Sequence, residues 1–147
     1  MTENEAPRRR TSGPGRTLVV FYFIMTIAAL ARSIVQMITS FSVAPLAISL
    51  SFVAGVVYLV ATISLVRAGR TAYLTAVATI VFELVGVLVV GTLSIAVPGL
   101  FPPPFQGRTG GTVWGWYGLE YVLLPLVLPV LGLLFLRSQR RVFAREA

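Results

Sequence analysis

The sequence predicts an all-α membrane protein, folded as a four-transmembrane-helix antiparallel bundle with both termini in the cytoplasm. Three observations support this fold class. Hydrophobic residues make up 56% of the 147 residues, charged residues make up 12%, and the mean hydropathy is +0.88. A soluble domain carries roughly 25% charged residues. The apolar residues fall in four long runs, and most arginines lie between or beyond these runs on one predicted side of the membrane.

The first element, residues 1–16, is polar and contains proline, glycine and the cluster Arg8, Arg9 and Arg10. This composition predicts a disordered basic cytoplasmic tail. The three arginines have two compatible interpretations. They are a topology signal that keeps this end in the cytoplasm, and they are also suited to contact anionic lipid headgroups.

The expected bundle covers residues 17–136, with spans at about 17–39, 46–66, 71–96 and 113–136. Each run is long enough for the roughly 20 residues that cross a hydrocarbon core. Short turns separate the first three spans, and Pro45 suits the first turn of the second. Residues 98–111 form a longer loop rich in proline and glycine, and residues 137–147 form a basic cytoplasmic tail.

The first span carries an alternative interpretation. Ala29-Leu30-Ala31 follows a short apolar stretch with a basic lead, and this arrangement resembles a signal-peptidase site. However, residues 34–41 stay mostly apolar and need residues 17–31 to complete a span. The sequence therefore favours an intact first span and leaves cleavage before Arg32 as the alternative.

The orientation follows from the arginines. If four helices alternate, ten arginines lie on one side, Arg108 alone lies on the other, and Arg32 lies within a span. The bias of arginine towards the cytoplasm then places both termini inside. Trp114, Trp116 and Tyr117 follow the outer loop, where an aromatic belt is expected. We expect a multi-pass protein of the bacterial cytoplasmic (inner) membrane.

Three charged residues fall within the predicted spans: Arg32, Glu83 and Glu120. At about 1.5 Å per residue, they lie at similar depths, roughly 21, 18 and 24 Å from the cytoplasmic ends of their spans. Charged side chains at this depth normally face protein and have partners. We infer an intramembrane charge cluster with Arg32 between the two acids, because a guanidinium group can serve two carboxylates.

Small and polar residues recur at helical spacing on the first three spans, and these stripes are expected to face the bundle interior. The stripes are Arg32, Gln36 and Thr39 on the first span, Ser51, Gly55, Tyr58 and Thr62 on the second, and Thr75, Thr79, Glu83, Gly86 and Ser94 on the third. Gln36, Tyr58, Thr79 and Tyr117 are the expected polar support for the cluster.

The charge cluster has two open interpretations. Buried ion pairs often fix which helices pack together. Intramembrane ionisable residues are also candidates for a proton, ion or ligand site. Pro125 and Pro129 predict a kink in the fourth span, either as a static bend or as a hinge for gating.

The composition excludes much chemistry. Cysteine, histidine, aspartate and lysine are absent, which removes thiolate chemistry, the commonest metal ligand and the usual general base. We therefore expect no metal, no cofactor, no nucleic-acid partner and no catalytic residues. The sequence favours a non-catalytic protein, although an isomerase that uses a carboxylate and a tyrosine stays open.

Two functions remain from different classes. The first is an accessory or assembly subunit of a larger membrane complex, in contact with the lipid bilayer and with other membrane subunits or further copies of itself. The second is an oligomeric proton- or ion-coupled small transporter or channel that uses Glu83. The small size and the missing catalytic set favour the first.

Three stretches resemble those of small, uncharacterised bacterial four-span integral membrane proteins. They are Ala31-Arg32-Ser33, residues 82–92 around Glu83, and residues 125–132. The resemblance covers residues 17–136 and implies the four-span fold, but it brings no known activity.

Overall fold

A computed structural model describes residues 13–101 and 112–145, with side chains described as far as residue 140. All regular structure in these two ranges is helical. The long helices are α1 (Pro14–Ser40), α2 (Pro45–Val66), α3 (Arg70–Ala96) and α4 (Leu124–Arg145). Two short elements, η1 (Pro98–Leu100) and η2 (Gly115–Tyr121), lie between α3 and α4. The tail expected over residues 1–16 lies outside the described residues except for its last four, and α1 begins within them at Pro14.

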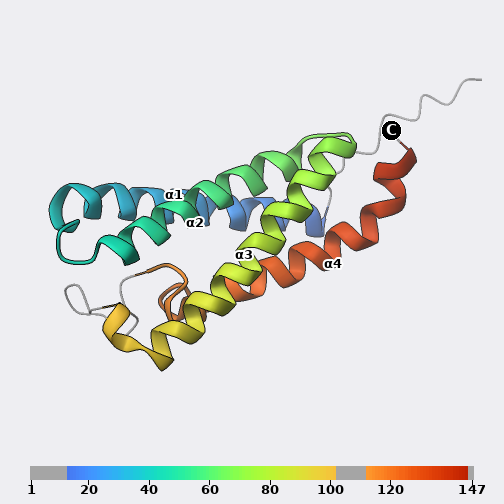
Figure 1. Ribbon diagram of the computed structural model, residues 1–147. Coiled ribbons are helices and arrows are strands. Elements are labelled where there is room, and N and C mark those ends of the chain that lie inside the picture. Colours follow the sequence, from blue (N-terminus) through green and yellow to red (C-terminus); the bar gives the residue numbers. More distant parts are fainter. Residues whose placement is uncertain (1–12, 102–111, 146–147) are drawn as a thin grey trace, which may run out of the picture.

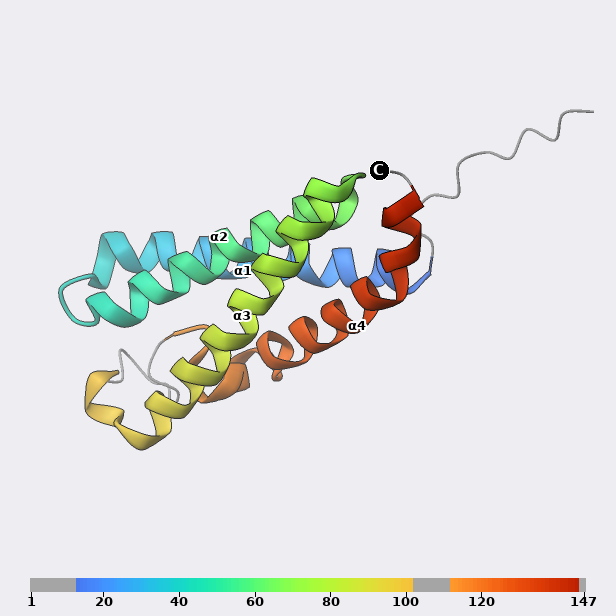
Figure 2. The same cartoon turned by 45° about the vertical axis from the view of Figure 1, so that its right-hand side comes forward.

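Helices α1 and α2 form a hairpin that is visible in both ribbon views (Figures 1 and 2). They pack closely at Gly55, where an added Cβ atom would lie 2.6 Å from Leu30 Cδ2. The hydroxyl groups of Thr26 and Thr62 lie 3.4 Å apart across the same interface. Small residues and hydroxyl groups therefore draw these helices together, as in other membrane helix pairs.

The buried stripe of α2 confirms the predicted one, since Ser51, Gly55, Tyr58 and Thr62 are all buried. The α2–α3 turn uses Gly69 with a φ of +106°, which favours glycine. Glu83 lies thirteen residues from each end of α3, at the middle of the helix.

The fourth apolar run is not the single helix expected over residues 113–136. Regular helix begins only at Leu124, and η2 meets α4 at a bend of 97°. Five residues in this segment have positive φ: Trp116, Tyr117, Gly118, Val122 and Leu123. Pro125 suits the start of α4, because proline fits the first turn of a helix.

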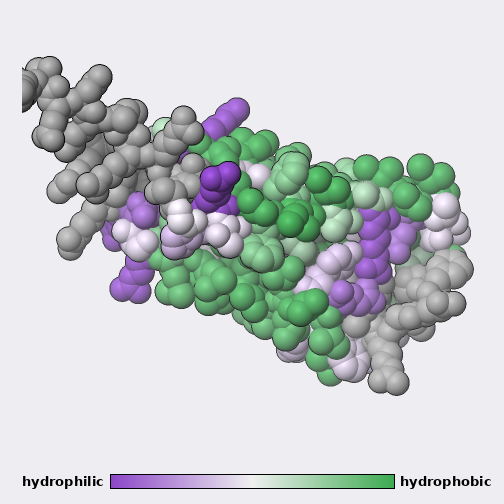
Figure 3. Space-filling model, turned by 180° about the vertical axis from the view of Figure 1, so that it is seen from behind, coloured by the Kyte–Doolittle hydropathy of each residue, from purple (hydrophilic) through white to green (hydrophobic). Residues whose placement is uncertain are grey.

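Three helices, α1, α2 and α3, are long and apolar enough to cross a membrane, and η2 with α4 makes a fourth if that bent pair is one span. The chain therefore has the character of a helical multi-pass membrane protein. Figure 3 shows a broad apolar surface along one face, with hydrophilic patches towards the two ends.

The element η2 lies between the long helices and is only partly buried. In Figures 1 and 2 the α2–α3 turn and the C-terminal end of α4 lie at the same end of the molecule. At the other end, the α1–α2 hairpin and the end of α3 spread apart, and η2 (orange) lies between them. This irregular segment brings Trp114 and Glu120 towards the long helices.

Candidate functional site

The first of two polar centres in the structure is formed by Glu83, which is buried between the helices. Its side chain is 0% exposed, although it carries an ionisable group. The hydroxyl group of Tyr22, from α1, donates a 2.8 Å hydrogen bond to Glu83 Oε2. The other oxygen, Oε1, is buried without a hydrogen-bond partner. An unmatched buried acceptor is energetically costly, so this carboxyl group is a candidate binding group.

The surroundings of Glu83 come from every long helix. Tyr58 of α2 lies beside Tyr22, with their ring centroids 6.3 Å apart. The hydroxyl group of Tyr58 accepts a 3.0 Å hydrogen bond from the indole N–H of Trp114. On α4, an added Cβ atom at Gly132 would lie 3.5 Å from the hydroxyl oxygen of Tyr22. The carboxyl group therefore lies in a close-packed aromatic setting.

Arg32 and Glu120 form the second polar centre. Arg32 Nη1 lies 2.7 Å from Glu120 Oε2, and the two side chains are 28% and 26% exposed. The same nitrogen donates a 3.2 Å hydrogen bond to the hydroxyl oxygen of Tyr121, whose ring centroid lies 5.9 Å from the guanidinium carbon. Arg32 is eight residues before the end of α1, or about 12 Å of helix rise. This pair is therefore partly exposed at the edge of the protein. Arg32 lies nearer the end of α1 than Glu83 lies to either end of α3.

The structure corrects the expected cluster of three charges. It joins Arg32 to Glu120 but gives Glu83 a different partner, Tyr22. Tyr22, which contacts Glu83, lies ten residues before Arg32 on α1, or about 15 Å of helix rise, so the common layer is also lost.

The physical reason lies in the faces of α1. Its buried stripe contains Tyr22, Thr26, Ala29 and Ser33, whereas in the predicted stripe Arg32 and Gln36 are only partly buried and Thr39 is exposed. Arg32 therefore lies at the margin of the buried face rather than at its centre.

The four residues expected as polar support do not form one cluster. Tyr58 lies beside Tyr22, as described above. Gln36 is partly buried, and its Oε1 atom has no hydrogen-bond partner. The hydroxyl group of Thr79 donates to the carbonyl oxygen of Thr75 in its own helix. The hydroxyl oxygens of Tyr117 and Thr92 lie 3.0 Å apart.

The two prolines expected to kink the fourth span lie at different positions in α4. Pro125 lies in the first turn of α4, where it starts the helix. Pro129 lies inside the helix. The pronounced bend precedes both of them, between η2 and α4.

Sequence reasoning missed three residues that shape these centres: Tyr22, Trp114 as a hydrogen-bond donor, and Tyr121. A signal for Tyr22 was present, because Tyr22, Thr26, Ala29 and Ser33 recur at helical spacing. No comparable signal existed for Tyr121, since its position depends on the irregular backbone of η2.

The side chains that are present limit what this part of the protein can bind. Within residues 13–101 and 112–145, no group of three or more histidine, cysteine, aspartate or glutamate side chains is placed to hold a metal ion. The arrangement offers one buried carboxyl group with a free acceptor and one ion pair at the protein surface. These groups can bind a proton or a cation, or can pair with another polypeptide.

Comparison with known proteins adds no family. No protein-family model, curated protein or solved structure matches this chain. The function must therefore be argued from the two polar centres.

Proposed function

We propose that this chain is a non-catalytic accessory or assembly subunit of a larger membrane complex, and that the surface around Arg32 and Glu120 contacts the rest of that complex. The single observation that carries the proposal is the exposure of this ion pair, at 28% and 26%. Partly exposed charges within the apolar part of a membrane are costly unless protein or water covers them. A partner helix would supply that cover.

The backbone beside the pair supports the same proposal. Irregular backbone at membrane depth is tolerated where protein or a water-filled cavity surrounds it. Part of η2 is covered internally, because Ser94 Oγ accepts a hydrogen bond from the backbone N–H of Trp116. Leu119, next to Glu120, is 50% exposed, so an apolar surface adjoins the ion pair. An ion pair beside an apolar surface suits a contact with another membrane protein.

The proposed topology has four antiparallel spans, the last of them formed by η2 and α4 together. Both termini lie in the cytoplasm of a bacterium, because arginines concentrate at the chain ends and at the α2–α3 turn. The proposed location in the bacterial inner membrane rests on the resemblance to small bacterial four-span membrane proteins.

A second candidate is a proton- or ion-coupled transporter or channel that uses Glu83. The observation that favours it is the buried Oε1 atom, which has no hydrogen-bond partner. A proton or cation could occupy that side of the carboxyl group. This alternative requires a path to Glu83, which opens when the helices move.

Extraction of the native protein in mild detergent separates the two candidates. The subunit proposal predicts stoichiometric partners of different sequence, which are lost from the double variant Arg32→Gln/Glu120→Gln and retained by the control variant Thr79→Ser. The transporter alternative predicts a homo-oligomer whose pH-dependent flux in reconstituted vesicles is lost in Glu83→Gln. Purification as a monomer that lacks both partners and flux contradicts both candidates.

A further inference from the structure

A groove between α3 and α4 combines an arginine-rich mouth with an apolar floor. It has a volume of about 460 Å³ and is lined by Tyr73 and Val77 of α3 and by Leu133, Leu136, Arg137 and Arg140 of α4. Small-molecule sites have volumes of roughly 300–1,000 Å³. The groove is therefore large enough to hold part of a lipid.

The order of these residues along each helix gives the groove a polarity. On α4, Arg140 and Arg137 lie nearest the C-terminal end, and Leu133 lies about 10 Å further in along the helix. On α3, Tyr73 is near the first turn and Val77 follows one turn later. The start of α3 and the C-terminal end of α4 lie at the same end of the molecule (Figure 1). The charged and aromatic lining residues are therefore nearest that end and form the mouth of the groove, and the aliphatic residues form its floor.

The charge at the mouth is positive. The two arginines are three residues apart, so they share one face of α4, and both side chains are exposed. The acids within the described part of the chain are Glu83 and Glu120. Glu83 lies ten residues beyond Tyr73 on α3, or about 15 Å of helix rise, and Glu120 precedes α4. Neither acid belongs to the groove.

We infer that this groove binds an anionic phospholipid, with the phosphate group at Arg137 and Arg140 and an acyl chain along Val77, Leu133 and Leu136. Guanidinium groups bind phosphate through paired, charge-assisted hydrogen bonds. Tyr73 is of the aromatic type that sits at headgroup level. Basic pockets between membrane helices on the cytoplasmic side are suited to anionic headgroups. The inference rests on the proposed cytoplasmic orientation of this end of α4, but it does not depend on the subunit proposal.

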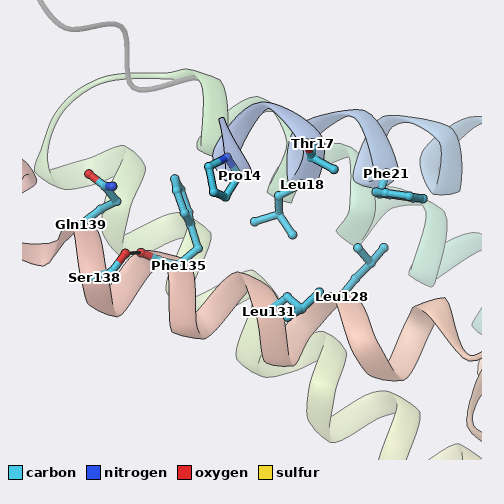
Figure 4. A pocket seen from close by; sticks show the side chains of 9 residues that line it. All are labelled: Pro14, Thr17, Leu18, Phe21, Leu128, Leu131, Phe135, Ser138 and Gln139. Carbon is cyan, nitrogen blue, oxygen red and sulfur yellow. Dashed lines mark hydrogen bonds between the residues drawn. The ribbon is translucent and has the colours of Figure 1, made fainter. Parts of the chain in front are cut away.

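A second groove, between α1 and α4, provides a contrast (Figure 4). It has a volume of about 520 Å³, and its lining is apolar apart from Thr17, Ser138 and Gln139. No arginine lines it. It therefore lacks the charge that selects an anionic headgroup over a zwitterionic one.

The test uses the full chain in mild detergent, titrated with dioleoyl phosphatidylglycerol or with dioleoyl phosphatidylcholine, which has the same acyl chains. Native mass spectrometry measures retained lipid, and thermal unfolding measures stabilisation. The anionic lipid is expected to bind more tightly. At about 1 kcal/mol per arginine, Arg140→Gln weakens binding about fivefold and Arg137→Gln/Arg140→Gln about 25-fold.

Arg16→Gln is the matched control, because it removes one exposed charge from α1 and leaves the groove unchanged. Its affinity for the anionic lipid should equal that of the unsubstituted chain. Equal weakening by Arg16→Gln and Arg140→Gln would show a general charge effect and overturn the proposal. Equal binding of the two lipids would overturn it as well. Displacement of the lipid by millimolar inorganic phosphate would remove the role of the acyl chain and contradict a phospholipid site.

Discussion

The hydroxyl group of Tyr22 on α1 donates a 2.8 Å hydrogen bond to the carboxyl group of Glu83 on α3. This contact joins two helices that are separated by α2 in the sequence. It also gives the fully buried Glu83 its hydrogen-bond donor, a neutral phenol rather than the expected guanidinium group. The protein interior is consequently polar at Glu83 without an ion pair there.

Tyr22→Phe should lower the free energy of unfolding by about 1–3 kcal/mol, because it leaves a buried carboxyl group without a donor. The measurement is unfolding of the purified chain by titration of mild detergent micelles with a denaturing detergent. Glu83→Gln should cost less, because the amide oxygen still accepts the hydrogen bond from Tyr22 and the side chain keeps its size.

The background variant Glu83→Leu is the control for this prediction. It removes the acceptor, so the hydroxyl group of Tyr22 loses its partner and Tyr22→Phe should then be neutral or stabilising. If Tyr22→Phe costs the same with Glu83 or Leu at this position, the two side chains are not coupled.

Arg32→Gln should destabilise the chain by about 1–3 kcal/mol, between the values for exposed and buried ion pairs. Glu120→Gln should recover part of this loss, because it removes the unmatched carboxylate. Glu83→Gln should not recover it, since Glu83 pairs with Tyr22. Recovery by Glu83→Gln and not by Glu120→Gln would restore the arrangement expected from the sequence. The same unfolding titration measures all four chains.

Gly86→Ala should destabilise the chain by about 1–3 kcal/mol through overpacking. The new Cβ atom would lie 2.7 Å from Trp114 Cζ3, and Trp114 is 2% exposed and hydrogen-bonded to Tyr58. Gly99→Ala is the matched control, because nothing lies within 4 Å of its Cβ position. Equal thermal stability of the two variants would show that Trp114 does not pack against α3 at Gly86.

Val122→Gly should raise the free energy of unfolding by about 0.5–1 kcal/mol. Val122 has a φ of +56°, and left-handed backbone costs a side-chain-bearing residue roughly 1–2 kcal/mol, against roughly 0.5–1 kcal/mol for the extra entropy of glycine. Its side chain is 83% exposed, so little packing is lost. Val127→Gly, at an exposed position inside α4, should destabilise instead. Destabilisation by both substitutions would argue for helical backbone at Val122.

The sequence predicted α2 well and α1 poorly, for a physical reason. On α2, the small and hydroxyl-bearing residues form one stripe, and that stripe is buried. On α1, two stripes of small or polar residues lie one position apart. The prediction followed the stripe that contains Arg32, but the other stripe is the buried one. A long arginine side chain can reach a partner from the margin of a buried face, so its presence does not locate the centre of that face.

The sequence did not predict the irregular segment before α4. The run from Val113 to Leu136 is apolar apart from Glu120, and hydropathy does not distinguish a straight span from a broken one. Pro125 is compatible with a helix start as well as with the kink that it predicts together with Pro129. The predicted pairing of Arg32 with Glu120 is present in the structure, although the two residues are far apart in the sequence.

The most direct test of the proposed protein contact is photo-crosslinking in native membranes. A photoreactive amino acid replaces Leu119, which adjoins Glu120, or Leu74, which is similarly exposed near the start of α3. The account predicts a protein adduct of defined mass from position 119, lost when Arg32→Gln/Glu120→Gln is added, and no such adduct from position 74. Lipid adducts alone from position 119, or the same protein adduct from both positions, would contradict it.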